Sequence, residues 1–365
     1  MTVAREPLAH LEASETAAVR DLREGYRRYR PSVITLVLGA AILASLVFLY
    51  VNGLWARAVG PDVVFVALVG VLALLGFALS LITSRPSRRP RARDVTLGLM
   101  GAVSAQFLTR ELDMPVLVAI GVIGCALGIA ALPSGPLDFM ASAAGYTGVF
   151  TGLLQPGPTL PWAWVVAAGL LAGVLFSVIG PAVLPGVGAR MGAVAFLVGS
   201  VVYWCAERTG TDAPSLLPVD TTAFSNWALL PVGMAGALVT WALTHRTTMP
   251  FVLASGLPLL AVCGVMCVAL PDQMAVLGCA WSGGTLIASA APERLPTAFW
   301  VGLAGVVYGA LMLHFGGPLT GHVGVLGATG TIACLATAAL EWLLHGRRVG
   351  RLMARVAQSP ATPAR

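Results

Sequence analysis

The sequence contains no lysine, so all 22 of its basic residues are arginines. Charged residues of either sign make up only 10% of the 365 residues, whereas soluble domains carry about 25%. A chain with so little charge cannot cover a normal water-exposed surface. We therefore expect an integral membrane protein without a water-soluble domain of useful size. The absence of lysine itself is interpreted as the codon bias of a GC-rich bacterial genome.

The common catalytic motifs are also missing. The sequence has no His-Glu-x-x-His, no Gly-x-Ser-x-Gly and no phosphate-binding loop, and no pair of Asp residues lies within an apolar run. All six Cys residues fall within apolar runs, where Cys behaves as a small hydrophobic residue. Cys263 and Cys267 share a helix face, but no His or carboxylate lies near them in sequence to complete a metal shell. The sequence therefore predicts no enzyme, no metal, no cofactor and no disulfide framework.

Long apolar runs dominate what is present. Apolar residues make up 57% of the chain, and the mean hydropathy is +0.85. Runs of about 18 or more apolar residues are typical of membrane-spanning helices. The sequence predicts an all-α fold, a polytopic transmembrane helix bundle with about twelve spans. The expected spans are residues 32–51, 63–83, 95–108, 115–132, 137–154, 161–183, 191–206, 227–243, 250–270, 274–291, 297–315 and 323–344.

The arginines predict the orientation, because cytoplasmic loops carry an excess of positive charge. Five of them crowd the short stretch SRPSRRPRARD after the second span, which we therefore place inside. All but Arg57, Arg110 and Arg208 then lie inside, and both termini are cytoplasmic at a bacterial cytoplasmic membrane. We expect a basic amphipathic segment (1–31), a transmembrane domain (32–345) and a basic tail (346–365). Their arginines suit anionic lipid headgroups, and we expect no nucleic-acid partner.

Two stretches predict an internal repeat. Phe139–Pro158 and Phe299–Pro318 are apolar, rich in small residues and end in a Gly-Pro break. Ungapped alignment matches six of their twenty residues, which gives a hypothesis of six plus six spans repeated in parallel. The alternative is a chance match between segments of similar composition. Broken helices at membrane depth line a cavity or are buried in protein.

The stretch AAGYTGVFTGLLQP (143–156) resembles the Gly-Tyr-Asn-x-x-Leu-x-Gly-Leu pattern of the urea transporters, and MPFVLA (249–254) resembles their Pro-Phe segment. The resemblance covers less than a tenth of the chain. Thr147 occupies the position of the Asn in that pattern. The resemblance implies repeats of inverted topology, whereas the match described above predicts parallel ones. We assign the chain to no family on these residues.

Candidate residues for a solute path surround the two breaks. They are Tyr146, Thr147, Thr151, Gln155, Tyr308, His314 and His322. Broken helix ends leave backbone groups free to replace the water around a solute, and a His beside them can change charge near neutral pH. For each there is a structural alternative, such as an interfacial His or a packed aromatic ring. Asp138 is interpreted as a carboxylate that offsets the dipole at the start of a helix, or as part of an inner pore mouth. Glu341 and His345 are interpreted as an i,i+4 pair.

Two functions follow from these features. The first is a permease or channel for a small neutral or weakly charged solute, since the spans contain almost no charge. The second is a non-transporting membrane subunit that assembles a larger cell-envelope complex. A homo-oligomer or another membrane protein is left open as a partner. A wet central cavity would favour the first function, and a solid bundle with a large exposed apolar flank would favour the second.

Overall fold

The computed structural model describes residues 33–54, 62–82, 90–153, 160–211, 227–314 and 324–345. The predicted N-terminal segment and C-terminal tail lie outside these residues. Every regular element within them is helical. The helices are α2 (Val33–Leu49), η1 (Tyr50–Leu54), α3 (Asp62–Ile82), α4 (Ala92–Arg110), α5 (Val116–Ala130), α6 (Phe139–Gly152), α7 (Trp162–Ala182), α8 (Arg190–Arg208), α9 (Leu229–Arg246), α10 (Phe251–Ala269), η4 (Pro271–Gln273), α11 (Met274–Ile287), α12 (Ala298–His314) and α13 (Val325–His345).

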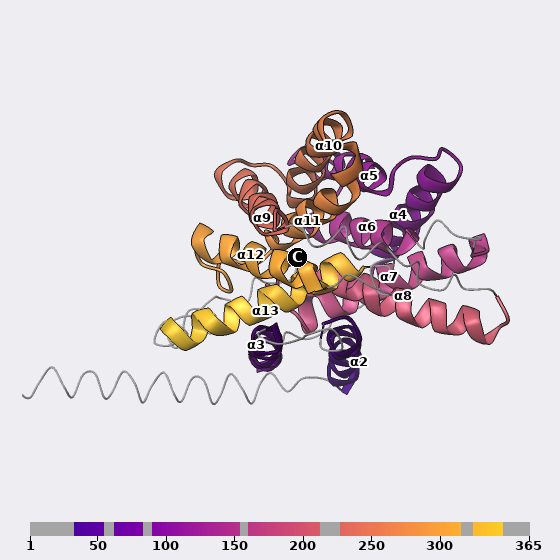
Figure 1. Ribbon diagram of the computed structural model, residues 1–365. Helices are drawn as coiled ribbons and strands as arrows, with labels where there is room; N and C mark the ends of the chain where they lie inside the picture. Colours follow the sequence, from indigo (N-terminus) through magenta and orange to yellow (C-terminus); the bar gives the residue numbers. More distant parts are fainter. Residues whose placement is uncertain are drawn as a thin grey trace, which may run out of the picture.

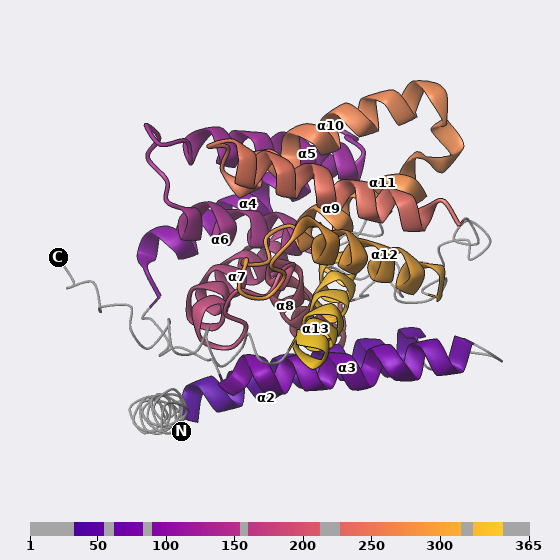
Figure 2. The ribbon, with the colours of Figure 1, turned by 90° about the vertical axis from the view of Figure 1, so that its left-hand side faces the viewer.

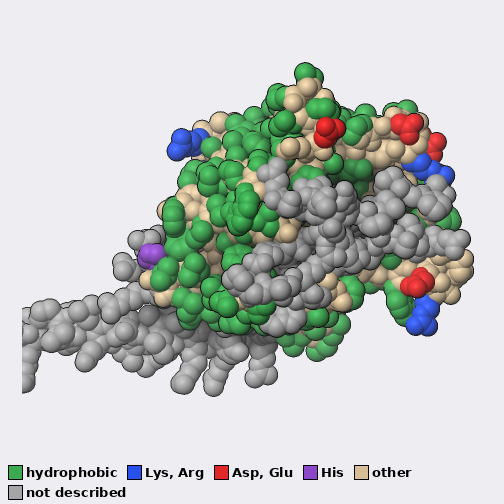
Figure 3. Space-filling model, viewed as in Figure 1, with side chains coloured by type: hydrophobic (Ala, Val, Ile, Leu, Met, Phe, Trp, Pro, Cys, Tyr) green, Lys and Arg blue, Asp and Glu red, His purple; other side chains and the backbone are tan. Residues whose placement is uncertain are grey.

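Each expected span overlaps one of these α-helices, but the structure does not show twelve parallel spans. Five described stretches are long and apolar enough to cross a membrane, and they lie in α2, α3, α7, α10 and α13. Figure 1 shows α7, α8 and α13 lengthwise and α2 and α3 nearly end-on, and Figure 2 shows the reverse. The helices therefore run in two steeply crossing directions. The described part of the face drawn in Figure 3 is largely apolar and has few charged side chains.

Helices α4–α8 and α9–α13 form two equivalent five-helix units. Val116 and Phe251 begin α5 and α10, and Arg190 and Val325 begin α8 and α13; both pairs are 135 residues apart. The backbone preceding α8 and α13 is also equivalent. Ala189 and Gly324, again 135 residues apart, both have positive φ, at 60° and 73°.

The same glycine contacts join the same helices in both units. In the first unit, a Cβ atom on Gly148 of α6 would collide with the carbonyl oxygen of Gly98 on α4. In the second unit, a Cβ atom on Gly284 of α11 would collide with the carbonyl oxygen of Gly233 on α9. Because small residues let helix backbones approach closely, these glycines are required for the packing of α6 and α11.

The two units are inverted relative to each other. Along α5, Gly121 lies against Leu260 of α10, whereas Gly128, two turns later, lies against the earlier Leu253. Residues later in α5 therefore contact residues earlier in α10, so these equivalent helices are antiparallel. Helices α8 and α13 are also antiparallel, and they come into close contact at Gly192 and Gly327.

The expected six-plus-six parallel repeat is therefore not confirmed. Phe139–Pro158 begins with α6, whose counterpart is α11, whereas Phe299–Pro318 covers α12, whose counterpart is α7. The match between the two stretches reflects their shared richness in small residues. The α2–α3 hairpin lies outside the repeat and packs on α13, where a Cβ atom on Gly76 would collide with the Leu335 carbonyl oxygen.

Candidate functional site

Helices α6 and α11 are short, central and equivalent in the two units. Each has 14 residues, a length of about 21 Å at 1.5 Å per residue, which is less than the roughly 30 Å of a bilayer core. Both lie in the middle of the molecule (Figure 1), and every residue of 141–152 on α6 is buried. Short segments at corresponding positions of two inverted halves are typical of the binding regions of transporters.

A chain of buried hydroxyl groups joins α6, α10 and α11. The Tyr146 hydroxyl lies 3.3 Å from Ser255 Oγ, which lies 2.7 Å from Thr285 Oγ1. The Thr285 hydroxyl donates to the Ser282 carbonyl oxygen at 2.7 Å. Since each hydroxyl has one hydrogen to donate, Ser255 donates to Thr285 and Tyr146 donates to Ser255. The side chains of Tyr146, Ser255 and Thr285 have no exposed surface.

Tyr308 reaches the same helix from α12. Its hydroxyl donates to the Cys279 carbonyl oxygen of α11 at 3.0 Å. The phenol lies directly over Gly283, because a Cβ atom there would collide with the Tyr308 hydroxyl oxygen. Both predicted tyrosines thus meet α11, Tyr146 through Ser255 and Tyr308 directly. We call Tyr146, Ser255, Thr285 and Tyr308, together with Trp281 and Ser282, the α11 polar site.

Two polar groups of this site have no hydrogen-bond partner within the described part of the chain. They are Trp281 Nε1 and Ser282 Oγ, both buried. Thr240 Oγ1, on the adjoining α9, is likewise buried and without a partner there. Buried polar groups are nearly always paired with protein, water or ligand. The α11 polar site therefore offers hydrogen bonds that the protein itself does not use.

Two other predicted path residues, Thr147 and Thr151, do not join this site. Thr147 and Thr151 are buried, and each hydroxyl donates within α6, to the carbonyl oxygens of Ala143 and Gly148 at 2.8 Å. His314 is the last residue of α12, and its side chain lies outside the described atoms. Gln155 and His322 lie outside the described residues. Their predicted roles stay predictions.

Sequence reasoning missed the partners of the tyrosines. Ser255 and Thr285 are single hydroxyl residues in apolar runs and give no periodic signal. Trp281 gave a different signal, its position. It lies near the middle of its expected span, away from the membrane interface that Trp prefers. Sequence reasoning also missed the buried Asp94 at the start of α4, because it is the last residue of the Arg-rich stretch. Ser177 Oγ donates to its Oδ2 at 3.3 Å.

The structure confirms the interpretation of Asp138 as a carboxylate at the start of a helix. Its Oδ1 accepts from the Ala141 N–H at 2.8 Å at the start of α6, and its Oδ2 pairs with Arg91 and Arg93. Partial burial alone would raise the pKa of this carboxyl. The Ala141 N–H and the charges of Arg93 and Arg91 outweigh that effect and lower the pKa. The pair of Glu341 with His345 is also confirmed, with 3.8 Å between Glu341 Oε1 and His345 Nδ1.

No protein-family model, curated protein or solved structure matches this chain. Among the described residues, no group of three His, Cys, Asp or Glu side chains is placed to hold a metal ion. The α11 polar site and the inverted arrangement of the two units are the described features that bear on function.

Proposed function

We propose that this chain is a membrane permease for a small neutral or weakly charged polar solute, which binds at the α11 polar site. The observation that carries the proposal is the set of unused buried hydrogen-bonding groups on α11, beside the hydroxyl chain from Tyr146 to Thr285. The site contains no Asp, Glu, Arg or His, so it suits a solute that forms hydrogen bonds without carrying full charge.

The inverted repeat supports this proposal. In transporters built from inverted repeats, the substrate lies at the interface of the repeats, and the two halves exchange conformations to open to either side. Here Tyr146 belongs to the first unit, and Ser255 and Thr285 belong to the second. Inverted topology is also what the resemblance to the urea transporters implies. Because the hydroxyl chain is fully buried, we interpret this structure as the closed conformation.

The proposal includes an orientation of the chain in the membrane. The arginine distribution supports an orientation with both termini and the α3–α4 connection on the cytoplasmic side of a bacterial cytoplasmic membrane. The α4 helix then begins inside. Its inverted counterpart α9 begins outside.

Solute entry into proteoliposomes tests the proposal. The full-length protein is reconstituted, and entry of urea, acetamide, glycerol and erythritol is followed by stopped-flow light scattering, with sodium chloride as the ionic comparison. We expect at least one neutral solute to enter about tenfold faster than into empty liposomes. We expect Thr285→Val and Ser282→Ala to reduce that rate severalfold and the exposed control Ser104→Ala to leave it unchanged. Entry at the empty-liposome rate for every solute would reject the proposal.

One observation favours the second function, a non-transporting subunit of a membrane complex. Only 28% of the apolar stretch in α3 is buried, and Leu68 and Val71 are more than half exposed. This flank would suit a partner helix within the membrane. Isolation of the chain in native-like nanodiscs, together with a stoichiometric second protein and without solute flux, would support this function over the permease.

A further inference from the structure

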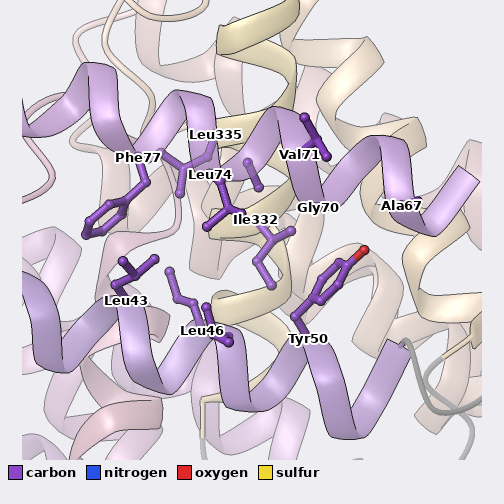
Figure 4. A pocket seen from close by; sticks show the side chains of 12 residues that line it. Leu43, Leu46, Tyr50, Ala67, Gly70, Val71, Leu74, Phe77, Ile332 and Leu335 are labelled. Atoms are coloured by element: carbon purple, nitrogen blue, oxygen red, sulfur yellow. The ribbon is translucent and has the colours of Figure 1, made fainter.

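The pocket between α2 and α3 is apolar. Leu43 and Leu46 of α2 and Leu74 of α3 lie along it (Figure 4). Among the described residues that line it, Tyr50 alone has a polar side chain, and its hydroxyl already donates to the Val66 carbonyl oxygen. An ionisable group that lacks such a partner lies elsewhere, at the start of α4.

The buried carboxyl group of Asp94 is almost unpaired. Asp94 is the third residue of α4 and is only 3% exposed. In the described part of the chain its Oδ1 has no hydrogen-bond partner, and its Oδ2 meets only Ser177 Oγ of α7, at 3.3 Å. This hydroxyl also lies 2.8 Å from the Gly173 carbonyl oxygen, so its single hydrogen serves two acceptors. An ionised Asp94 would therefore receive at most one shared hydrogen bond.

Asp94 differs in this respect from Asp138, the other acidic residue at the start of a helix in the first unit. Asp138 Oδ1 accepts from the Ala141 N–H, whereas no described N–H donates to the Asp94 carboxyl group. A buried carboxylate without a cation or a full set of donors is costly, and ionisable residues within membrane bundles mark ion or proton pathways. Asp94 therefore requires a compensating cation.

The second unit shows that helix packing does not require this carboxyl group. Gly173 of α7 lies against the Asp94 backbone, and the equivalent Gly309 of α12 lies against the Leu229 backbone. Leu229, 135 residues after Asp94, is fully buried. The residue four positions after Gly309, where the first unit has Ser177, is also Leu. The same backbone contact is thus formed with two apolar side chains, so the polar pair of the first unit has a role beyond packing.

A proton fits this place better than a metal ion does. A Cβ atom on Gly173 would lie 2.9 Å from the Asp94 carbonyl oxygen, so the backbones of α4 and α7 are in contact beside the carboxyl group. Hard metal cations take about six or more oxygen ligands, whereas Ser177 supplies the one side-chain oxygen described within hydrogen-bonding distance of Asp94. A proton needs a single carboxylate oxygen and no further space.

Few charged groups of the surrounding helices face Asp94. Helices α5 and α7 contain no Asp, Glu, Arg or His. On the α4 side, Arg91 and Arg93 pair with Asp138 at the start of α6. Arg190 of α8 lies over a phenyl ring of α7. Because no described ion pair includes Asp94, its protonation changes the charge of this region by one unit without breaking an existing pair.

Helix α4 connects Asp94 to the α11 polar site. Two turns after Asp94, Gly101 lies against the carbonyl oxygen of Gly145, the residue before Tyr146. We propose that Asp94 and Ser177 bind a proton that couples solute transport to a proton gradient, an inference that rests on the proposed permease. On binding, the proton forms an O–H bond with the Asp94 carboxylate. On release this bond breaks, and the proton passes to water on the side where α4 begins, the cytoplasmic side in the proposed orientation.

Infrared difference spectroscopy tests the proton site without any solute. The full-length protein in liposomes is titrated from pH 9 to pH 5, and its spectra are compared with those of Asp94→Asn. A carboxylic acid in dry surroundings absorbs at higher wavenumber than a hydrated one, which separates Asp94 from exposed carboxyl groups. We expect this band to be lost in Asp94→Asn and kept in the exposed control Asp272→Asn. Absence of a band that depends on Asp94 would overturn the proposal.

Proton entry tests the coupling. Proteoliposomes that contain a pH-indicator dye receive the neutral solute that enters fastest. We expect the lumen to acidify as solute enters, Asp94→Asn to reduce acidification at least fivefold, and Asp272→Asn to leave it unchanged. Solute entry without proton entry, or full acidification with Asp94→Asn, would overturn the proposal. If no solute enters, the permease itself is rejected, and the infrared band still decides whether Asp94 binds a proton.

Melting temperatures separate this role from a structural one. Because the second unit packs Leu229 at the equivalent position, we expect Asp94→Asn and Asp94→Leu to fold and to melt no lower than the unaltered protein. Asp94→Asn also keeps the size of the neutral acid. Loss of folded protein in both variants would show that the carboxylate holds α4 on α7, and would overturn the proposal.

Discussion

At the scale of single residues, a chain of buried hydroxyl groups joins α6, α10 and α11. A buried hydroxyl without a partner costs about 1–3 kcal/mol, whereas a satisfied one contributes about 1 kcal/mol net. The chain from Tyr146 to the Ser282 carbonyl oxygen satisfies three hydroxyls in sequence. Ser255 is its middle member, so its loss affects a neighbour on each side.

We therefore expect Ser255→Ala to destabilise the protein more than Tyr146→Phe. Removal of Ser255 Oγ leaves the Tyr146 hydroxyl without an acceptor and Thr285 Oγ1 without a donor, and the expected loss is about 1–3 kcal/mol. Tyr146→Phe removes the end of the chain and should cost about 1 kcal/mol. Unfolding titrations of the purified protein measure both, with the exposed Ser104→Ala as the control. Equal losses in all three variants would contradict the hydroxyl chain.

A second residue-scale prediction concerns the charge of Asp138. Because its folded-state pKa is lowered, its contribution to stability is present above the unfolded pKa of about 3.9 and is lost as the pH falls through the folded pKa. Asn caps helices as well as Asp does, so Asp138→Asn removes the ion pairs and keeps the cap. We expect this variant to lower the melting temperature at pH 7 but not near pH 2.

Asp272→Asn serves as the control for this measurement, because Asp272 is exposed and no ion pair of it is described in the structure. It should leave the melting temperature unchanged at both pH values. If Asp138→Asn destabilised the protein equally at pH 7 and pH 2, the carboxylate charge would have no part in fixing the start of α6.

At the scale of elements, glycine determines how the helices pack. Gly148 lets α6 contact the Gly98 backbone of α4, and Gly284 does the same for α11 against Gly233 of α9. An added methyl group at such a position has no side chain to displace, because its neighbour is backbone. The helices themselves would have to separate.

Gly148→Ala should therefore be strongly destabilising, with an expected loss of several kcal/mol, although alanine is the better helix former. Gly264→Ala is the matched control, because a Cβ atom on Gly264 of α10 would meet nothing within 4 Å. It should be neutral or stabilise the protein by up to about 1 kcal/mol. Thermal unfolding in detergent compares the two. A harmless Gly148→Ala would show that α4 and α6 do not pack through these glycines.

The helices could largely be predicted from the sequence, and their partners could not. Apolar runs and the Pro residues before α5, α7 and α10 mark helix positions locally. The hydroxyl chain joins Tyr146 to Ser255 and Ser255 to Thr285, contacts that no local pattern encodes. The repeat did leave a signal, since Trp-Val-x-x-Ala-Gly-x-x-x-Gly begins at both Trp164 and Trp300. Comparison of stretches chosen for their Gly-Pro breaks overlooked it.

At the scale of the whole molecule, the inverted repeat determines the topology. Each unit contains five helices, so the chain passes from the first unit to the second with its direction reversed. The contacts between α5 and α10, and between α8 and α13, are antiparallel as this requires. Equivalent positions of the two units should therefore face opposite sides of the membrane.

This topology can be tested at Glu111, which follows α4, and at Arg246, the last residue of α9; the two are 135 residues apart and both are exposed. In the proposed orientation, the end of α4 lies outside and the end of α9 lies inside. A membrane-impermeant thiol reagent added to intact cells should label Glu111→Cys and should label Arg246→Cys only after the cells are opened. The parent protein gives the background from Cys267, which is exposed, and Cys267→Ser removes it. Labelling of both positions from the same side would show that the two units are parallel. The exchange of conformations between inverted halves would then lose its structural basis, although the α11 polar site itself would remain.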